Sequence, residues 1–285
     1  MKRLIFSAIL LIGFSGLILE TESARAQSIF LEPNSGAAVQ LEALRPNFAG
    51  LNLTNTSFTL FLSSRIKVGE DLQVRAEVPF SYFKRDEYYD PYLGNNVQPS
   101  QGENSIGNPY LGLEFGKSDN GFKGEAGIRI PVLADFNTAS AIGTATDPVE
   151  RMEAFADELL PIYFGANYNY KSRSGFAMRI RLVPVFWLYL NNTGGSRNND
   201  IFALYSAQAW YEEGKVGVGG GFSGRVITTG DASGFGNRSL HQFGFFANYS
   251  FGQYMPGFQV RFPLDSDLKD SGMNPSYSLS IGIKL

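Results

Sequence analysis

The sequence contains no cysteine, only one histidine and no long apolar run after its first twenty residues. Without cysteine, the chain has no disulfides, thiolate metal sites or lipid attachment at an N-terminal cysteine. Without a second apolar run, the rest of the chain has no helical membrane span, which needs about 20 apolar residues. The net charge of −3 argues against nucleic acid as a partner. Mean hydropathy is close to zero, at −0.11, so any hydrophobic surface must be distributed along the chain.

The amino terminus has the pattern of a secretory signal peptide. Two basic residues precede an apolar run over 4–19, and the small residues Ala24 and Ala26 follow. We therefore expect a removed signal peptide over 1–26 and a single exported domain over 27–285. An exported chain of this kind can cross a membrane only as a closed β-barrel, because every backbone polar group must be paired in lipid.

Apolar and polar residues alternate in twelve segments beyond the leader, most regularly over the last ten residues, 276–285. A period of two predicts strands with one apolar face, and an even number of such strands is typical of bacterial outer-membrane barrels with a wet lumen. The segments lie near 37–45, 57–68, 71–83, 108–117, 121–132, 160–171, 175–189, 201–212, 215–227, 240–251, 257–264 and 276–285.

The connections between these segments are alternately short and long, as in a barrel with short periplasmic turns and long outer loops. We therefore predict an all-β fold, a transmembrane antiparallel up-and-down β-barrel of about twelve strands with both termini inside. The short connections lie at 69–70, 118–120, 172–174, 213–214 and 252–256. The long ones lie near 46–56, 84–107, 133–159, 190–200, 228–239 and 265–275.

Arginine recurs on the lumen-facing phase of the strands predicted to run outward. Proline follows most of these arginines within four residues, at the point where a strand ladder can end. One hypothesis is a charged constriction that attracts anionic or polarised solutes. The other is a brace in which arginine pairs with glutamate, including Glu42, and fills the barrel. The predicted pore-lining residues are Arg75, Glu77, Glu114, Glu125, Arg129, Arg181, Arg225 and Arg261.

The longest loop, 133–159, carries a helix signal. Asp147 can cap a helix and Pro148 fits its first position, so we predict a short helix over 148–159. This helix would either gate the barrel mouth or rest on its rim. The residues of its apolar face are Met152, Phe155, Ala156 and Leu159. The acidic side chains of this loop are interpreted as a solvated face, and they are Asp135, Asp147, Glu150, Glu153, Asp157 and Glu158.

An enzymatic barrel is the third possibility, because outer-membrane phospholipases also have twelve strands and use a His beside a Ser nucleophile. The sole histidine, His241, stands two residues after Ser239, whereas that family places its Ser two residues after the His, where this chain has Phe243. The chain also lacks GxSxG, HExxH and P-loop motifs. We therefore predict no enzymatic activity, no metal and no cofactor.

Three short motifs resemble an exported barrel family. They are the segment Arg75–Phe80, the segment Gly107–Leu113 and the glycine-rich strand 217–224. In these motifs the chain is similar to the meta-pathway phenol-degradation family. The resemblance implies an outer-membrane transporter of the same general kind as the channels for hydrophobic compounds and fatty acids. It does not transfer a phenol substrate.

We therefore predict a porin-like channel of the bacterial outer membrane, surrounded by lipid, for passive passage of small solutes, including aromatic or other hydrophobic compounds. The alternative is a structural or surface-binding barrel whose lumen is closed by Arg–Glu pairs. Strand number does not separate the two, because a barrel of twelve strands lies between filled and open ones. The sequence specifies neither the solute nor the oligomeric state.

Overall fold

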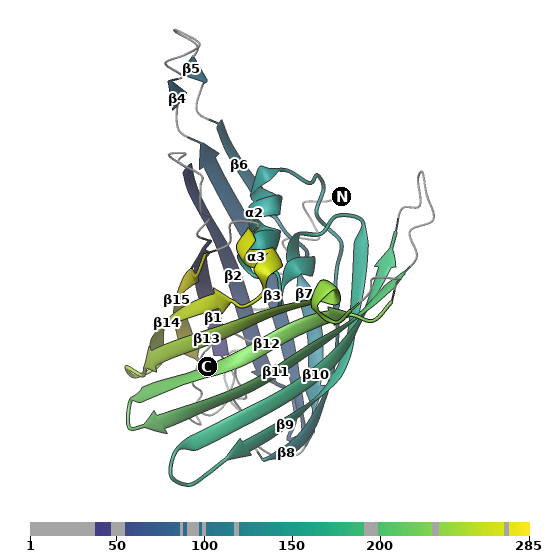
Figure 1. The fold of residues 1–285 in the computed structure, drawn as a ribbon. Helices are drawn as coiled ribbons and strands as arrows, with labels where there is room; N and C mark the ends of the chain where they lie inside the picture. Colours follow the sequence, from purple (N-terminus) through teal and green to yellow (C-terminus); the bar gives the residue numbers. More distant parts are fainter. Residues whose placement is uncertain are drawn as a thin grey trace.

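The computed structural model describes residues 38–46, 55–85, 88–89, 97–98, 101–116, 120–190, 199–229, 234–270 and 274–285. The predicted signal peptide lies outside these residues. Over the described ranges, twelve antiparallel strands close into the predicted up-and-down barrel (Figure 1). The barrel strands are β1 (Ala38–Arg45), β2 (Asn55–Lys67), β3 (Leu72–Arg85), β7 (Tyr110–Phe115), β8 (Gly121–Arg129), β9 (Leu159–Lys171), β10 (Phe176–Tyr189), β11 (Asp200–Glu213), β12 (Val216–Ile227), β13 (Ser239–Tyr249), β14 (Tyr254–Pro263) and β15 (Ser276–Lys284).

The first and last strands close the barrel. Leu41 of β1 lies opposite Ile281 of β15 on one side and opposite Leu62 of β2 on the other. Closure pairs each of the twelve barrel strands with two neighbours, so the described part of the barrel wall has no unpaired edge strand. Stability in this cysteine-free chain therefore comes from the closed ladder rather than from disulfides.

The strand β7 is continued by β6 (Gln101–Ile106), which lies end to end with it beside β3. The two are separated by residues 107–109, where Pro109 has no N–H to donate to the ladder. Two further short strands, β4 (Tyr88–Tyr89) and β5 (Val97–Gln98), pair with each other beyond the barrel (Figure 1). The expected loop over 84–107 is thus wrong in part, because the polar segment Gln101–Ile106 lacks the apolar alternation that reveals the other strands.

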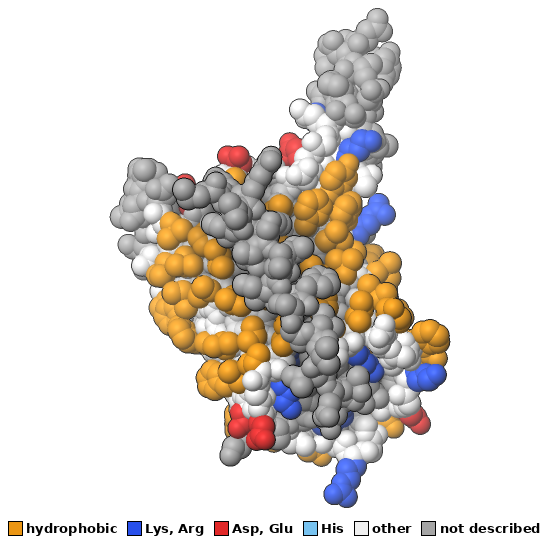
Figure 2. All heavy atoms as spheres, turned by 180° about the vertical axis from the view of Figure 1, so that it is seen from behind, with side chains coloured by type: hydrophobic (Ala, Val, Ile, Leu, Met, Phe, Trp, Pro, Cys, Tyr) orange, Lys and Arg blue, Asp and Glu red, His pale blue; other side chains and the backbone are white. Residues whose placement is uncertain are grey.

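The outer and inner faces of the barrel differ in polarity, as the alternation predicts. Tyr277 and Leu279 of the last strand are exposed, whereas Ser278 between them is buried. On the face that Figure 2 shows, hydrophobic side chains cover the middle of the wall, and charged side chains lie toward its two ends. None of the helices within the described ranges is long and apolar enough to cross a membrane.

The long connection between β8 and β9 enters the barrel at the end with the long loops (Figure 1). It contains α2 (Thr138–Thr146), which contacts β2, β3 and β6, and a 3₁₀ turn, η1 (Met152–Phe155). Residues 138–156 are called the plug segment below. Two further short helices lie outside it, η2 (Gly236–Arg238) and α3 (Ser266–Asp270).

The helix expected over 148–159 is wrong in position. The helix runs over 138–146, where Asn137 caps it and forms a capping box with Ser140. Asp147 ends this helix instead of starting one, although its carboxylate still accepts a hydrogen bond from the Glu150 amide at 3.2 Å. Leu159 is already the first residue of β9. Asp147 therefore keeps the side-chain contact of a helix cap. Ion pairs between the plug segment and the barrel wall nevertheless hold the residues after it in a turn.

Candidate functional site: the charged barrel interior

Carboxylates of the plug segment pair with arginines of the barrel wall. The Asp147 Oδ2 atom lies 3.2 Å from Nη1 of Arg261 on β14. The Glu150 Oε2 atom lies 3.3 Å from Nη1 of Arg181 on β10. All four side chains are almost completely buried. The plug segment is therefore bound to widely separated parts of the wall by charge-assisted hydrogen bonds.

Glu153 makes the third such attachment. It pairs with Arg225 of β12 and accepts a hydrogen bond of 2.9 Å from the indole Nε1 of Trp187 on β10. The Arg225 guanidinium also lies 5.8 Å from the Trp187 ring centroid and 5.2 Å from that of Phe202, distances at which cations and aromatic faces attract. Glu153 is completely buried, so this carboxylate depends on these partners for its solvation.

Arg151 is a buried cation of the plug segment that the sequence reading did not single out. Its guanidinium pairs with Glu42 of β1 at 2.6 Å, with Asp147 at 3.1 Å and with Glu77 of β3 at 3.7 Å. It also lies 4.0 Å from the ring centroid of Phe61 on β2. Arg151 thus reverses the pattern of the other contacts, because here the plug supplies the cation and the wall supplies the carboxylates.

The interpretation of the loop carboxylates as a solvated face is therefore wrong for Asp147, Glu150 and Glu153. Burial raises the pKa of Asp147, but the guanidinium groups of Arg261 and Arg151 outweigh burial, so this pKa lies below its usual value. Burial also raises the pKa of Glu150, and there the nearby cations leave the pKa above its usual value. The two carboxylates of one segment therefore respond to acid in opposite ways.

A second group of ion pairs joins the strands to one another. Glu77 of β3 pairs with Arg129 of β8 at 2.7 Å, and Glu125 of β8 pairs with Arg181 of β10 at 2.5 Å. Another such pair joins β3 and β7 and is formed by Arg75 and Glu114. All eight residues predicted to line the lumen are buried in the barrel interior, and these are Arg75, Glu77, Glu114, Glu125, Arg129, Arg181, Arg225 and Arg261.

A buried asparagine attaches the plug segment to the wall between β6 and β7. The Asn108 side chain donates to the Ala156 carbonyl at 2.5 Å and accepts from the amides of Val132 and Leu133, at 3.0 and 3.1 Å. Its own amide donates to the Ala154 carbonyl at 2.6 Å. Sequence reasoning noticed this position only as part of the motif 107–113, because its role depends on a contact far along the chain.

Phe155 makes an apolar contact between the plug segment and the wall. Its ring packs edge-on against Phe61, with centroids 6.4 Å apart, in a buried cluster that includes Leu44. A Cβ at Gly107 would lie 2.8 Å from the Phe155 ring, and one at Gly143 of α2 would lie 2.5 Å from it. Two glycines therefore leave the space that this ring fills. Of the predicted helix face, Phe155 and Leu159 are buried and Met152 is half-buried.

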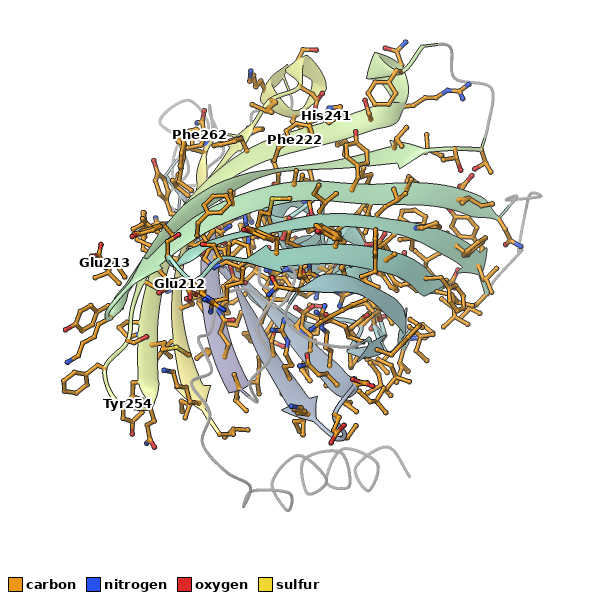
Figure 3. The ribbon with its side chains drawn as sticks, turned by 90° about the horizontal axis from the view of Figure 1, so that it is seen from below. Glu212, Glu213, Phe222, His241, Tyr254 and Phe262 are labelled. Atoms are coloured by element: carbon orange, nitrogen blue, oxygen red, sulfur yellow. The ribbon has the colours of Figure 1, made fainter. Side chains whose placement is uncertain are left out.

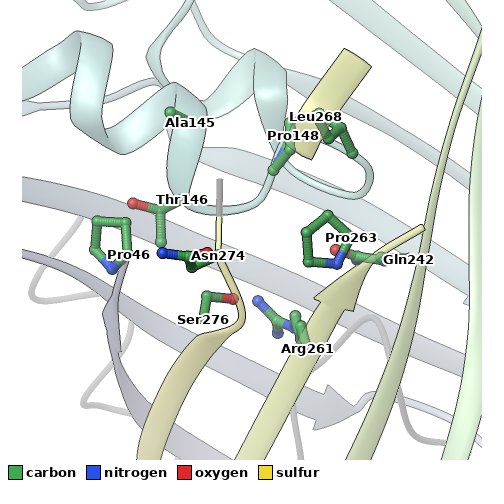
Figure 4. A pocket seen from close by; sticks show the side chains of 10 residues that line it. All are labelled: Pro46, Ala145, Thr146, Pro148, Gln242, Arg261, Pro263, Leu268, Asn274 and Ser276. Carbon is green, nitrogen blue, oxygen red and sulfur yellow. The ribbon is translucent and has the colours of Figure 1, made fainter. Parts of the chain in front are cut away.

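A small pocket that is partly open to solvent lies at the mouth beside the end of α2 (Figure 4). Its lining combines Thr146 and Pro148 of the plug segment with Gln242 and Arg261 of the wall. A second, smaller space lies along β11 to β14, and Gln242 and Arg261 also line it. These two residues therefore stand where the mouth pocket meets the inner space.

The single histidine lies outside the lumen in a different cluster (Figure 3). The His241 ring contacts the Tyr205 hydroxyl through Nε2 at 2.6 Å and the Asp265 carboxylate through Nδ1 at 2.8 Å. Ser239 instead donates to the Phe235 carbonyl at 2.8 Å. Within the described residues, then, no hydrogen bond joins Ser239 to His241.

No protein-family model matches this chain, and no curated protein is recognisably similar in sequence. Solved structures share its fold. An outer-membrane channel from Pseudomonas putida F1 aligns with a TM-score of 0.56 and 10% identity, over 94% of this chain and 100% of that one. The NanC porin aligns with a TM-score of 0.50 and 10% identity, over 87% of this chain and 100% of that one.

LpxR from Salmonella typhimurium aligns equally well, with a TM-score of 0.50 and 8% identity, over 87% of this chain and 100% of that one. At such low identities these likenesses establish a shared barrel fold. Because one fold hosts many functions, the function has to be argued from the interior itself.

Proposed function

We propose that this protein is an outer-membrane channel for passive passage of small solutes, and that the plug segment is its gate. The observation that carries the proposal is that Asp147, Glu150 and Glu153 each pair with an arginine from a different strand. The apolar outer band suits a lipid surrounding, and the predicted signal peptide suits export. The names of the solved channel and porin agree with this function.

Energetics favours a gate over a permanent filling. Taking paired charges out of water costs about as much as their attraction returns, so a buried ion pair contributes little net stability. When the plug segment leaves the lumen, its carboxylates and the arginines of the wall regain water together. The closed and open arrangements are therefore close enough in free energy for a modest signal to shift them.

The interior favours polar solutes over the hydrophobic compounds that the sequence resemblance implies. Along β11 to β14 its buried lining includes Gln208, Gln242, Gln259 and Ser223. On the other strands the lining includes arginine and glutamate. An apolar molecule in this lumen would desolvate these groups without pairing them. We therefore assign the central route to small polar solutes.

A structural barrel is the second candidate, and the ion pairs between strands favour it. Glu77 with Arg129 and Glu125 with Arg181 join strands directly and would fill the lumen without any gate. In that case the outer loops would carry the function by binding a partner. A phospholipase-like enzyme has less support, because Ser239 is hydrogen-bonded to backbone and not to His241.

Single-channel recording in planar bilayers tests the proposal. The informative variant combines Asp147→Asn, Glu150→Gln and Glu153→Gln, which keeps side-chain volume but removes the three carboxylates. We expect long openings in this variant and rare, brief ones in the natural protein. The matched control, Asp157→Asn with Glu158→Gln, alters exposed carboxylates nearby and should behave like the natural protein. A folded, inserted variant that stays silent at all voltages would exclude the channel.

A further inference from the structure

Glu153 of the plug segment occupies a site formed by three neighbouring strands of the barrel wall. Arg225 of β12 pairs with its Oε1 atom, and the indole Nε1 of Trp187 on β10 donates to the same oxygen at 2.9 Å. Phe202 of β11, the strand between them, packs on Trp187 with ring centroids 4.3 Å apart. Trp187, Phe202 and Arg225 are called the carboxylate site below, because a carboxylate is what they hold in this structure.

Glu153 uses this site only in part. Among the described residues, its second oxygen, Oε2, has no hydrogen-bond partner, and neither have Nε and Nη1 of Arg225. Both side chains are almost completely buried, so these atoms are also removed from water. An arginine can bind the two oxygens of one carboxylate with two parallel hydrogen bonds, which is stronger than a single contact. The carboxylate site could therefore hold a carboxylate more firmly than it holds Glu153.

The backbone of the plug segment accounts for this partial contact. The Glu153 carbonyl accepts a hydrogen bond from Nδ2 of Asn108 at 3.2 Å, and the Ala154 carbonyl accepts one from the Asn108 amide at 2.6 Å. Asn108 lies between β6 and β7, so the main chain of Glu153 is fixed by a different part of the wall from the one that holds its side chain. A carboxylate on a free molecule has no such attachment and can turn both oxygens toward Arg225.

The carboxylate site lies near the end of the barrel that carries the long loops. Trp187 stands two residues before the last residue of β10, and Phe202 stands two residues after the first residue of β11. Each residue of a strand adds about 3.3 Å, so both rings lie roughly 7 Å from the strand ends. Both rings are half-buried, whereas Arg225 is 1% exposed. A solute from outside would therefore meet the rings first and would reach Arg225 once Glu153 moves away.

The surroundings of the site favour an organic carboxylate over a neutral solute or a simple ion. Trp187 and Phe202 pack against a buried apolar cluster that includes Val185 and Leu204, so an apolar body would find a matching surface. Within the described residues, Glu153 is the only carboxylate that pairs with Arg225. A neutral solute that displaced it would leave a buried cation without a counter-charge, which is costly.

We infer that a small organic carboxylate displaces Glu153 from the carboxylate site and thereby releases the plug segment. The inference rests on the proposed channel function, and it names both a solute class and the signal that opens the gate. One carboxylate replaces another, so Arg225 keeps a counter-charge throughout the exchange, and a bidentate contact favours the incoming molecule. Because Glu153 makes one of the three carboxylate contacts between plug and wall, its displacement shifts the closed arrangement toward the open one.

Tryptophan fluorescence tests the exchange directly, because Trp187 belongs to the site. The chain has two tryptophans, so a Trp210→Phe background leaves Trp187 as the reporter. At constant ionic strength, butyrate should change its emission saturably, whereas butyramide, which has nearly the same shape but no charge, should not. Glu153→Gln should tighten the apparent affinity for butyrate about tenfold, because an amide competes for Arg225 less well than a carboxylate. Asp157→Asn neutralises an exposed carboxylate nearby and should leave the affinity unchanged.

A double variant locates the binding, and channel recording separates the inference from the channel itself. Arg225→Gln with Glu153→Gln removes both charges of the pair, so neither is left buried and unpaired, and it should lose the saturable response. Equal responses to butyrate and butyramide, an affinity that Glu153→Gln does not tighten, or binding retained in the double variant would overturn the inference.

In planar bilayers, butyrate should raise the open probability of the natural protein and butyramide should not. Channel current that butyrate leaves unchanged would overturn the inference and retain the channel. Saturable binding of butyrate without any channel current would retain the carboxylate site and contradict the proposed function.

Discussion

The two halves of the barrel interior are filled differently. On the side of β3 to β10, wall arginines such as Arg129 and Arg181 pair with glutamates two strands away. On the side of β11 to β14, the lining is mainly amide, hydroxyl and glycine, and a small space remains. The plug segment joins the halves, since it binds Arg181 in the first and both Arg225 and Arg261 in the second.

This difference separates mechanical support from passage. Ion pairs between strands fix the shape of one half, because breaking either partner leaves a buried charge without compensation. The half along β11 to β14 is held by fewer ion pairs between strands, so the route we propose runs there. Only the contacts of the plug segment have to break for a solute to pass.

The largest expected effect is on the charged side. Arg129→Ala leaves Glu77 without its partner at 2.7 Å in a buried position and should lower the free energy of unfolding by about 3–5 kcal/mol. On the side of β11 to β14, Gln208→Met should change the free energy of unfolding by less than about 1 kcal/mol, because no protein hydrogen bond is lost. Urea unfolding in detergent micelles measures both. Equal losses would break the distinction between the two halves.

The next effect concerns the contact between Gly107 and Ala154, which positions the plug segment. Gly107→Ala places a Cβ 2.1 Å from the Ala154 carbonyl and should displace the plug, at a cost of about 1–3 kcal/mol. Limited proteolysis of residues 138–156 reports the displacement as faster cleavage. Gly236→Ala is the control, since a Cβ there meets open space. An unchanged rate of cleavage in the Gly107→Ala variant would mean that the position of the plug segment does not depend on this contact.

Acid should release the plug segment in a defined range. The pKa of Asp147 is lowered, so its stabilising contribution is present above its unfolded pKa of about 3.9 and is lost as the pH falls through the folded value. The pKa of Glu150 is raised, so its contribution is present below about pH 4.3 and is lost as the pH rises through the folded value.

We therefore expect single-channel open probability to stay low from pH 7 to about 4, and to rise below that, as Asp147 loses Arg151 and Arg261. Asp147→Asn should lack this acid transition. Opening that begins between pH 7 and 5 and persists in Asp147→Asn would assign the response to another group.

The smallest effect lies outside both halves. His241→Ala removes contacts to Tyr205 and Asp265 on the outer wall and should lower the free energy of unfolding by about 1–2 kcal/mol. Channel current should not change, because this cluster does not line the lumen. A loss of phospholipid hydrolysis in this variant, relative to a natural protein that shows it, would instead favour the enzymatic alternative.

The sequence predicted the barrel well, because strand phase is a local property. Alternation of the kind seen in Leu279, Ser280 and Ile281 needs no knowledge of distant residues, and the twelve strands followed from it. The strand β6 was missed because its residues are polar on both faces. The buried position of the predicted arginines also followed from phase.

The position of the plug segment could not be predicted from strand phase. The position of the plug segment depends on a contact between residues 107 and 154. Its ion pairs join residues far apart in the sequence, Glu42 to Arg151 and Asp147 to Arg261. Local signals at Asp147 and Pro148 were sound for a helix start, but these tertiary contacts outweighed them. The unpaired atoms of Gln208 likewise appear only once the strands are placed side by side.

A disulfide lock tests the gate most directly. The hydroxyls of Thr59 on β2 and Thr146 at the end of α2 lie 3.0 Å apart, and the chain has no cysteine to interfere. Thr59→Cys with Thr146→Cys, placed in the variant that carries Asp147→Asn, Glu150→Gln and Glu153→Gln, should be silent in planar bilayers when oxidised and should conduct after reduction. Thr59→Cys alone should conduct in both states. Equal currents from the oxidised and reduced double-cysteine protein would contradict the assignment of the plug segment as the gate.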